Sequence, residues 1–312
     1  MQLPMHLQEK INNLYLKLPK KKLTETRAEL TKKYKEQTGA SRSLIGSNED
    51  SLVYSISRMP ATFSVIFSLV KNLLDQGYLS DVKSVADIGS GTGAGYFALK
   101  EIFEDVEFHL YERDKYMINA FYDLCDEKVE VLKTDIIKEN ISFDADLIIS
   151  SYVLSEMTES DRLAVVKKLL PKDSRKLLLI DTGTPEVYNE YMRIKDFVQD
   201  LGYNIVAPCV SKKCTLENDY CQFYARVERS AIHKQIKDAT LSYEDEKYFY
   251  LLIQKDALGT DKNRVLRRPR FAPNMIEHTL CTPDGIVKKI YTKKDKEQFK
   301  SAKKTDINGL IG

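Results

Sequence analysis

The feature that most constrains the fold is a glycine-rich loop that joins a short apolar strand to a helix. Residues 84–88 have the apolar character of a buried strand, and Asp87-Ile88-Gly89-Ser90-Gly91-Thr92-Gly93 leads from them into a helical stretch. Glycines at alternate positions let the backbone turn sharply and let a ligand approach it closely. This arrangement predicts an open α/β sheet in which ligands lie beyond the carboxyl ends of the strands.

Short apolar segments alternate with helical ones from residue 83 to about residue 206. This alternation predicts a mostly parallel, Rossmann-like sheet with helices on both faces. The predicted strands are residues 84–88, 107–111, 129–133, 145–150, 176–181 and 204–208. The predicted helices between them are residues 95–102, 115–124, 159–170 and 185–201.

The segments before and after this alternating pattern differ from it in residue composition and expected secondary structure. Residues 1–45 are polar and helical, with Leu7, Ile11, Leu14 and Leu18 forming an apolar stripe, and Pro60 fits the first turn of a later helix. After residue 208 cysteines, charges and aromatics follow, with strands expected at 248–254 and 286–291. The sequence therefore divides into a helical N-terminal region (1–80), a Rossmann-like domain (81–208) and a cysteine-rich, basic C-terminal region (209–312).

Composition excludes several classes of protein. The 312 residues are 43% hydrophobic and 30% charged, which is typical of a globular chain. No apolar run approaches the roughly 18–20 residues that cross a bilayer, and the N-terminus lacks the pattern of a secretory signal. We therefore expect a cytoplasmic protein that does not contact membranes, and we expect a monomer.

Positive charge gathers at the two ends of the chain, although the net charge is only +2. Residues 262–304 hold 13 Lys or Arg against 4 Asp or Glu, and residues 20–35 hold two lysine clusters. Arg264, Arg267, Arg268 and Arg270 precede the last cysteine and would form an RNA surface there, because arginine side chains fork onto phosphates. Solvated surface charges are the alternative interpretation of both ends.

Three acidic residues follow three successive predicted strands and favour one ligand. Asp87, two positions before the first glycine, repels a pyrophosphate but can pair with the ammonium group of S-adenosylmethionine (SAM). Glu112 ends the second strand, where a carboxylate accepts hydrogen bonds from ribose hydroxyls, and Asp135 follows the third, near the expected adenine. A dinucleotide-binding dehydrogenase is the alternative. The expected SAM-binding residues are Asp87, Gly89, Ser90, Gly91, Gly93, Glu112, Asp135 and Ser150.

The end of the fourth strand should face the methyl group of the donor. The sequence there lacks the Asn-Pro-Pro-Tyr of adenine and glutamine N-methyltransferases and the Pro-Cys nucleophile of cytosine C5 enzymes. Ser150, Tyr152 and Glu156 remain as catalytic candidates, and helix capping or packing is an equal interpretation of each.

Four of the five cysteines lie after the predicted domain, at Cys209, Cys214, Cys221 and Cys281. A cytosolic protein seldom keeps structural disulfides, so the cluster indicates a metal site. Structural zinc usually has two close pairs of ligands, whereas three near cysteines and a remote fourth suit a [4Fe–4S] cluster better. Zinc and unliganded cysteines remain the alternatives.

Short motifs in a fixed order identify a family. The sequence from about residue 54 to 304 resembles the methyltransferase-like proteins associated with assembly of the mitochondrial small ribosomal subunit, together with their bacterial relatives. The motifs are Arg58-Met59-Pro60-Ala61-Thr62, Asp87 to Gly93, Ser151-Tyr152-Val153-Leu154, Asp181-Thr182-Gly183-Thr184-Pro185, Tyr243-Glu244-Asp245-Glu246-Lys247, Arg264-Val265-Leu266-Arg267 and Cys281-Thr282-Pro283-Asp284-Gly285.

The resemblance implies a class I SAM-dependent methyltransferase domain and a [4Fe–4S] cluster on Cys209, Cys214, Cys221 and Cys281. It also implies association with small-subunit rRNA and the assembling small ribosomal subunit. Two hypotheses follow: an rRNA methyltransferase, or a non-catalytic assembly factor that binds SAM and rRNA. A radical SAM enzyme is disfavoured by the four cysteines and by the class I donor loop.

Overall fold

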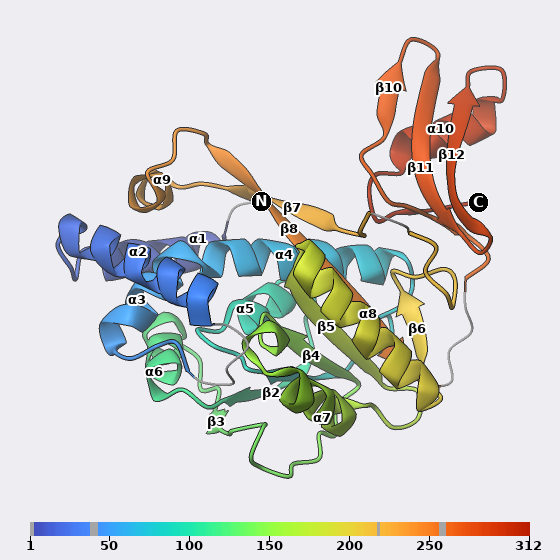
Figure 1. Ribbon diagram of the computed structural model, residues 1–312. Helices are drawn as coiled ribbons and strands as arrows, with labels where there is room; N and C mark the ends of the chain where they lie inside the picture. The colour runs from blue at the N-terminus through green and yellow to red at the C-terminus, as the bar shows by residue number, and fades with distance from the viewer. Residues whose placement is uncertain (1–2, 38–42, 217–218, 256–259) are drawn as a thin grey trace.

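The computed structural model describes residues 3–37, 43–216, 219–255 and 260–312. Its main sheet consists of β1 (Ser84–Ile88), β2 (Glu107–Glu112), β3 (Val131–Lys133), β4 (Leu147–Ser151), β5 (Lys176–Thr182), β6 (Asn204–Ala207), β7 (Phe223–Glu228) and β8 (Tyr243–Gln254). The strand order is β3-β2-β1-β4-β5-β8-β6, and β7 pairs with β8 outside this path (Figure 1). Strands β1 to β5 are parallel, whereas β8 runs antiparallel to β5, β6 and β7.

Helices cover both faces of the main sheet, which explains why its central strands are continuously apolar. Helices α7 (Glu159–Leu169) and α8 (Pro185–Asp200) lie on one face (Figure 1). Helices α4 (Met59–Asp75), α5 (Ala94–Lys100) and α6 (Lys115–Leu124) lie on the other. Pro60 occupies the first turn of α4, as the sequence predicts. The prediction of an α/β, Rossmann-like sheet is therefore confirmed.

The N-terminal helices pack on the α4–α6 side of the sheet. They are α1 (Met5–Tyr15), α2 (Lys20–Gln37) and α3 (Asn48–Ser57). The predicted stripe on α1 is confirmed, because Leu7, Ile11 and Leu14 are buried. Residues 1–2 and 38–42 of the predicted helical region lie outside the described residues. Helix α9 (Ala231–Lys237), between β7 and β8, contacts α2 and α3.

A second, smaller sheet projects from the main body (Figure 1). It contains β9 (Asn263–Val265), β10 (Arg270–Ala272), β11 (Met275–Thr282), β12 (Gly285–Thr292) and β13 (Leu310–Ile311), with α10 (Lys296–Lys304) packed on it. Its own small core contains Val265, Ile276, Leu280, Tyr291, Ala302 and Ile311. The predicted boundary after residue 208 does not separate the two sheets, because β7 and β8 belong to the main one.

In the part of the chain that the structure describes, no single helix is long and apolar enough to cross a bilayer, although the bent pair α3–α4 reaches that length and composition when taken together.

Candidate functional site

A cavity of about 90 Å³ lies where strands β1, β2 and β4 end. Gly89 and Gly91 of the glycine loop line it, together with Glu112 at the end of β2 and Ser151 and Tyr152 at the end of β4. This is the edge at which an open α/β sheet binds its ligands. The structure therefore brings the glycine loop and the second and fourth strand ends to one site, as the sequence predicts.

Glu112 fixes the shape of the glycine loop. Its Oε2 accepts a hydrogen bond from the Gly91 backbone N–H at 2.9 Å, and its Oε1 accepts one from the Asp114 N–H at 2.8 Å. Gly91 has a φ of +55°, and a Cβ added there would meet only the Gly89 carbonyl oxygen, at 3.9 Å. The loop is therefore an open cradle at Gly91, in which a side chain would occupy the space of a bound molecule.

Two other predicted SAM-binding residues, Asp87 and Ser90, lie beneath this cradle. Asp87 is 1% exposed, and a Cβ added to Gly95 would lie 2.3 Å from its Oδ2, so its carboxyl group points at the start of α5. Neither of its oxygens has a hydrogen-bond partner. Ser90 is also buried, with an unpartnered hydroxyl. Neither residue lines the cavity, and their contact with a donor stays a prediction.

The remaining predicted donor residues also stand back from the cavity. Gly93 caps α5 in the left-handed conformation and packs against Phe121. Asp135 accepts a hydrogen bond from the Ile137 N–H at 3.1 Å, while its neighbours Thr134 and Ile136 line the cavity. Ser150 is 1% exposed and its hydroxyl has no partner. Their roles toward a donor remain predictions as well.

Burial, and after it the charge of Glu112, raises the pKa of Asp87 from 3.8 to about 7. A carboxyl group whose pKa is raised by folding stabilises the fold while it is protonated, and this stabilisation is lost as the pH rises. We expect the donor-free protein to lose thermal stability between pH 4 and pH 7, and Asp87→Asn to flatten that decline. Thermal unfolding of both proteins across this range is the measurement. An unchanged slope in the variant would assign the decline to other groups.

The acceptor side of the cavity contains Glu156 and residues that the sequence did not single out. Glu156 ends the 3₁₀ turn η1 (Leu154–Glu156), and its Oε2 lies 3.9 Å from Arg113 Nη2. Tyr34 of α2 and Tyr54 of α3 also line the cavity, with ring centroids 6.1 Å apart. Burial raises the pKa of Glu156 to about 8, with Glu112 and Asp181 acting in the same direction and Arg113 against them. No local pattern could have placed these tyrosines here, because only the packing of the N-terminal helices does so.

Tyr152 has a strained backbone at the end of β4. Its φ is +60°, in the left-handed region that residues other than glycine seldom adopt, and its buried hydroxyl has no hydrogen-bond partner. Such outliers gather at functional sites, where the surrounding structure holds them in place. Tyr152 therefore stays a candidate, because it lines the same cavity as Gly89 and Gly91.

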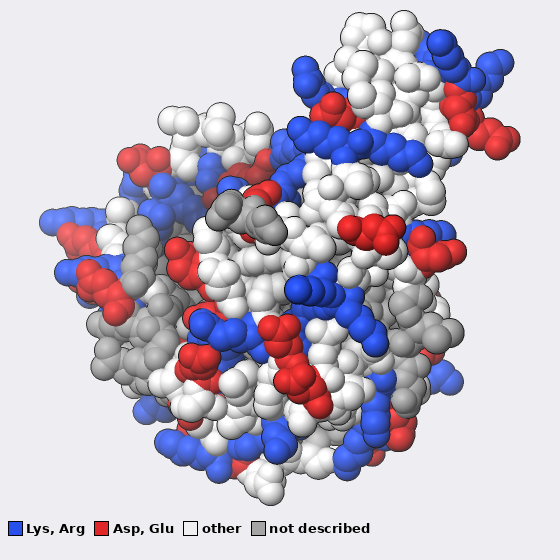
Figure 2. Space-filling model, turned by 45° about the vertical axis from the view of Figure 1, so that its right-hand side comes forward, with Lys and Arg blue, Asp and Glu red and all other residues white. Residues whose placement is uncertain are grey.

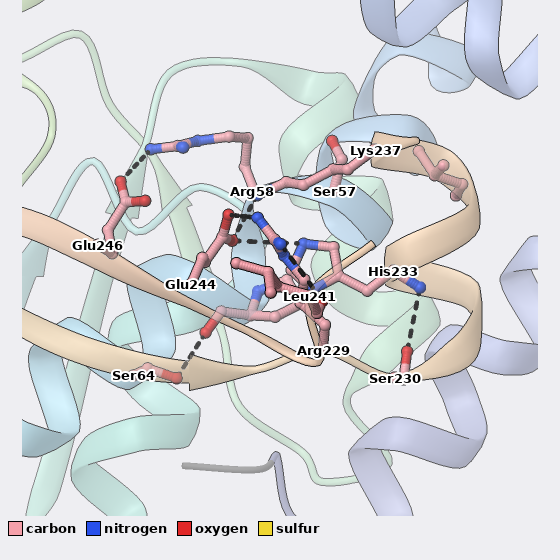
Figure 3. Close-up of polar contacts among 12 residues, drawn as sticks. Ser57, Arg58, Ser64, Arg229, Ser230, His233, Lys237, Leu241, Glu244 and Glu246 are labelled. Atoms are coloured by element: carbon pink, nitrogen blue, oxygen red, sulfur yellow. Dashed lines mark hydrogen bonds and ion pairs between the residues drawn. The ribbon is translucent and has the colours of Figure 1, made fainter. Parts of the chain in front are cut away.

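A network of ion pairs connects β8 with Arg58, Arg229 and α9 (Figure 3). Arg58, which precedes α4, lies 3.1 Å from Glu246 of β8, and the charge of Arg58 acts on the hydroxyls of Tyr54 and Tyr152. Beside it, Glu244 of β8 pairs with Arg229 at 2.5 Å and with Lys237 of α9 at 2.6 Å. The motifs around Arg58 and Glu244 thus connect the start of α4 with β8, Arg229 and α9.

The four cysteines predicted as metal ligands come together at a second place. Cys209, Cys214, Cys221 and Cys281 all line one small cavity of about 30 Å³. The Tyr188 hydroxyl lies 3.1 Å from Cys214 Sγ. Within the described ranges no three His, Cys, Asp or Glu side chains stand in an arrangement ready to hold a metal ion. The structure therefore shows the gathering of the thiols, and metal binding is left as a proposal.

The predicted arginine surface needs a correction. Arg264 is 0% exposed, because it is hydrogen-bonded inside the junction of the two sheets, so it is not part of a surface. Arg267 pairs with Asp219 at 2.7 Å. Arg268 stacks on the Tyr224 ring, 3.9 Å from its centroid, and Arg270 is exposed. The sequence did not reveal which of these arginines faces inward, and RNA binding by the others stays a prediction.

Comparisons with known proteins give one sequence match and several structural likenesses. Residues 48–308 match the family described as mitochondrial small ribosomal subunit Rsm22. A search of curated proteins finds no match. The plantazolicin methyltransferase BpumL is 12% identical, with 80% of this chain and 99% of that chain covered and a TM-score of 0.45. Magnesium protoporphyrin IX methyltransferase from Synechocystis PCC 6803 is 13% identical, with 72% and 91% covered and a TM-score of 0.43.

Proposed function

Because this chain belongs to the family described as mitochondrial small ribosomal subunit Rsm22, we propose that it is a SAM-dependent methyltransferase acting on small-subunit rRNA or on assembly intermediates of that subunit. The observation that carries the proposal is the open cradle at Gly91, closed on one side by Glu112. We place the protein in the cytoplasm, as a monomer that does not contact membranes.

The residues around the cradle fit a nucleoside-containing donor. Gly89 and Gly91 offer backbone without side chains, and Glu112 offers a carboxylate at the strand end where ribose hydroxyls bind in related sheets. When bound, SAM supplies an activated methyl group of its own, so the protein has mainly to orient the two reactants. The cavity that these residues line continues to Tyr152 and Glu156, where an unstacked nucleotide would enter.

We propose that Glu156 is the residue that accepts the proton released by the acceptor nucleotide. An acceptor N–H or O–H that gains the methyl group gives up its proton, and the ionised form of Glu156 would accept it, as a stronger base than an exposed carboxylate because burial raises its pKa to about 8. Arg113, 3.9 Å away, holds the carboxyl group at the cavity wall. Tyr34 and Tyr54 supply aromatic faces for a base on the same side.

We expect Glu156→Gln to bind SAM normally and to transfer methyl groups about 100-fold more slowly, because the amide cannot take up the proton. Transfer of labelled methyl to precursor particles and SAM affinity, measured on the same preparation, separate the two effects. The matched control is Glu159→Gln, three residues further along on the exposed start of α7. Wild-type transfer rates in Glu156→Gln would remove Glu156 from the mechanism.

We propose that the C-terminal unit, which consists of the smaller sheet and α10, is the RNA surface. Figure 2 shows Lys and Arg side chains along the sides of this projecting unit and in a band at its base. Exposed lysines follow β12 and continue along α10, at Lys293, Lys294, Lys296, Lys300, Lys303 and Lys304. Such a surface meets phosphates without reading sequence, so binding to rRNA should weaken steeply with salt.

We further propose that Cys209, Cys214, Cys221 and Cys281 hold a [4Fe–4S] cluster, with zinc as the alternative metal. The donor set fits, since three thiols from residues 209–221 and one from β11 line one cavity. The cluster would connect residues 209–221 to β11, and so stiffen the junction between the main sheet and the RNA surface.

A second candidate function is a SAM-binding rRNA assembly factor without catalysis. The narrow acceptor side of the cavity favours it, because a narrow acceptor side leaves little room for a nucleotide beside the donor. Tyr34, Leu44 and Ile45 of the N-terminal region narrow the acceptor side.

One experiment decides between the two. Small-subunit precursor particles from cells that lack this protein are incubated with labelled SAM and with protein purified without oxygen. Label at one rRNA position, absent with a Gly91 variant, supports the methyltransferase. Binding of SAM and of particles without transfer of label would favour the assembly factor.

A further inference from the structure

Two positively charged side chains are buried beside the four-cysteine cavity. Lys195 of α8 is 2% exposed and Arg264 of β9 is 0% exposed. Lys195 Nζ donates to the Ser211 carbonyl oxygen at 3.4 Å, and Arg264 Nε donates to the Pro208 carbonyl oxygen at 2.6 Å. Both carbonyls belong to the segment around Cys209. Both cations are therefore hydrogen-bonded to the backbone segment that carries the first of the four cysteines.

These contacts leave the positive charges without a counter-charge. The other acceptors of Arg264 are neutral oxygens, on the Gln76 side chain and on Asn308, and its Nη2 has no partner. Across the described ranges neither Lys195 nor Arg264 forms an ion pair with a carboxylate. A buried cation without a partner is strongly unfavourable, so a fold that keeps two of them together indicates a negative group nearby.

The four cysteines would supply this negative charge as metal-bound thiolates. Arg264 pairs in register with Cys281 across β9 and β11. Lys195 and Arg264 are also hydrogen-bonded to the backbone on either side of Cys209. The two cations therefore stand beside two of the four proposed ligands.

We infer that Lys195 and Arg264 are charge-compensating residues for a doubly negative metal–thiolate centre held by the four cysteines. The inference rests on the proposed cluster and goes beyond it, because it assigns two residues that are not ligands. A cubane core on four thiolates and a zinc ion on four thiolates are both doubly negative, and two buried cations match either. Nearby positive charge also favours the reduced, more negative state of a cluster, so both residues raise its reduction potential.

The test is Lys195→Met, which keeps an unbranched side chain shorter by one heavy atom and removes its charge, with Lys195→Arg as the control that keeps the charge. Each protein is prepared metal-free and with the cluster reconstituted under anaerobic conditions. Iron loss to a chelator, reduction potential and thermal unfolding are measured on both forms.

We expect opposite effects in the two forms. Without metal, Lys195→Met should unfold at the same or a higher temperature than the wild type, because an unbalanced buried charge is gone. With the cluster, it should lose iron about tenfold faster and have a more negative reduction potential. Lys195→Arg should behave as the wild type does.

Three results would count against the inference, and they are distinguishable. Equal destabilisation of both forms would mean that Lys195 is only a packing residue. Iron retained equally by Lys195→Met and wild type would overturn the charge role alone and leave the cluster intact. Wild-type protein that takes up neither iron nor zinc would overturn the cluster as well. Should the wild type hold zinc instead, faster zinc loss from Lys195→Met supports the inference while the cluster fails.

Discussion

Gly91→Ala should abolish useful SAM binding while leaving the fold in place. The new methyl group would point into the cavity, where only the Gly89 carbonyl oxygen lies within 4 Å, so it meets the ligand and little else. Crowding of this kind costs about 1–3 kcal/mol, which corresponds to a loss of affinity of up to about 100-fold. Equilibrium binding of SAM to purified wild type and variant is the measurement.

The chain offers a matched control for backbone strain. Gly202, between α8 and β6, has a φ of +83° and open space around it, but it lies outside the cavity. Gly202→Ala should therefore share the cost of a positive φ, about 1–2 kcal/mol, without affecting SAM. If both variants bind SAM equally, the cradle at Gly91 is not the donor site.

Cys221→Ser should prevent metal binding and destabilise the junction between the two sheets. Cys221 is the most deeply buried of the four cysteines, and its pKa is raised well above the usual value by burial. A serine hydroxyl cannot replace a thiolate as a soft ligand, and loss of a structural metal removes folding free energy directly. We expect iron content to fall to background and the melting temperature to drop by about 10 °C or more.

Cys125→Ser is the control for this variant, because Cys125 ends α6 far from the four-cysteine cavity. It should keep the iron content of the wild type. Since Cys221 is buried, serine also introduces a polar group there, so metal content must be measured together with stability. A Cys221→Ser protein with full metal content would exclude Cys221 as a ligand, whatever its melting temperature.

The sequence predicted most of the strands because the local pattern and the tertiary environment agree for them. Residues 84–88 and 176–181 are short apolar runs between turns, and they form β1 and β5 with nearly those bounds. The predicted strand at 248–254 also exists, but nothing in its residues indicates that it enters the main sheet beside β5. That placement depends on contacts between segments about 70 residues apart, which local patterns do not encode.

The candidate site was predictable where it rests on the glycine loop and the strand ends, as for Gly91 and Glu112. Its acceptor side was not, because Tyr34 and Tyr54 reach it only through packing of the N-terminal helices. The surface position predicted for Arg264 is wrong for a different reason. Composition assigns charged residues to solvent by default, and only the fold shows that this one is enclosed.

The position of β8 has a consequence for how the chain is made. During synthesis β1 to β5 emerge first, and β5 then presents an unpaired apolar edge until residues 243–254 have been added. Three of the four cysteines precede β8 in the chain, so they leave the ribosome before the sheet can close. Assembly of the sheet edge therefore waits for β8, which is synthesised after these three thiols. A nascent chain that stops before residue 243 should remain dependent on chaperones.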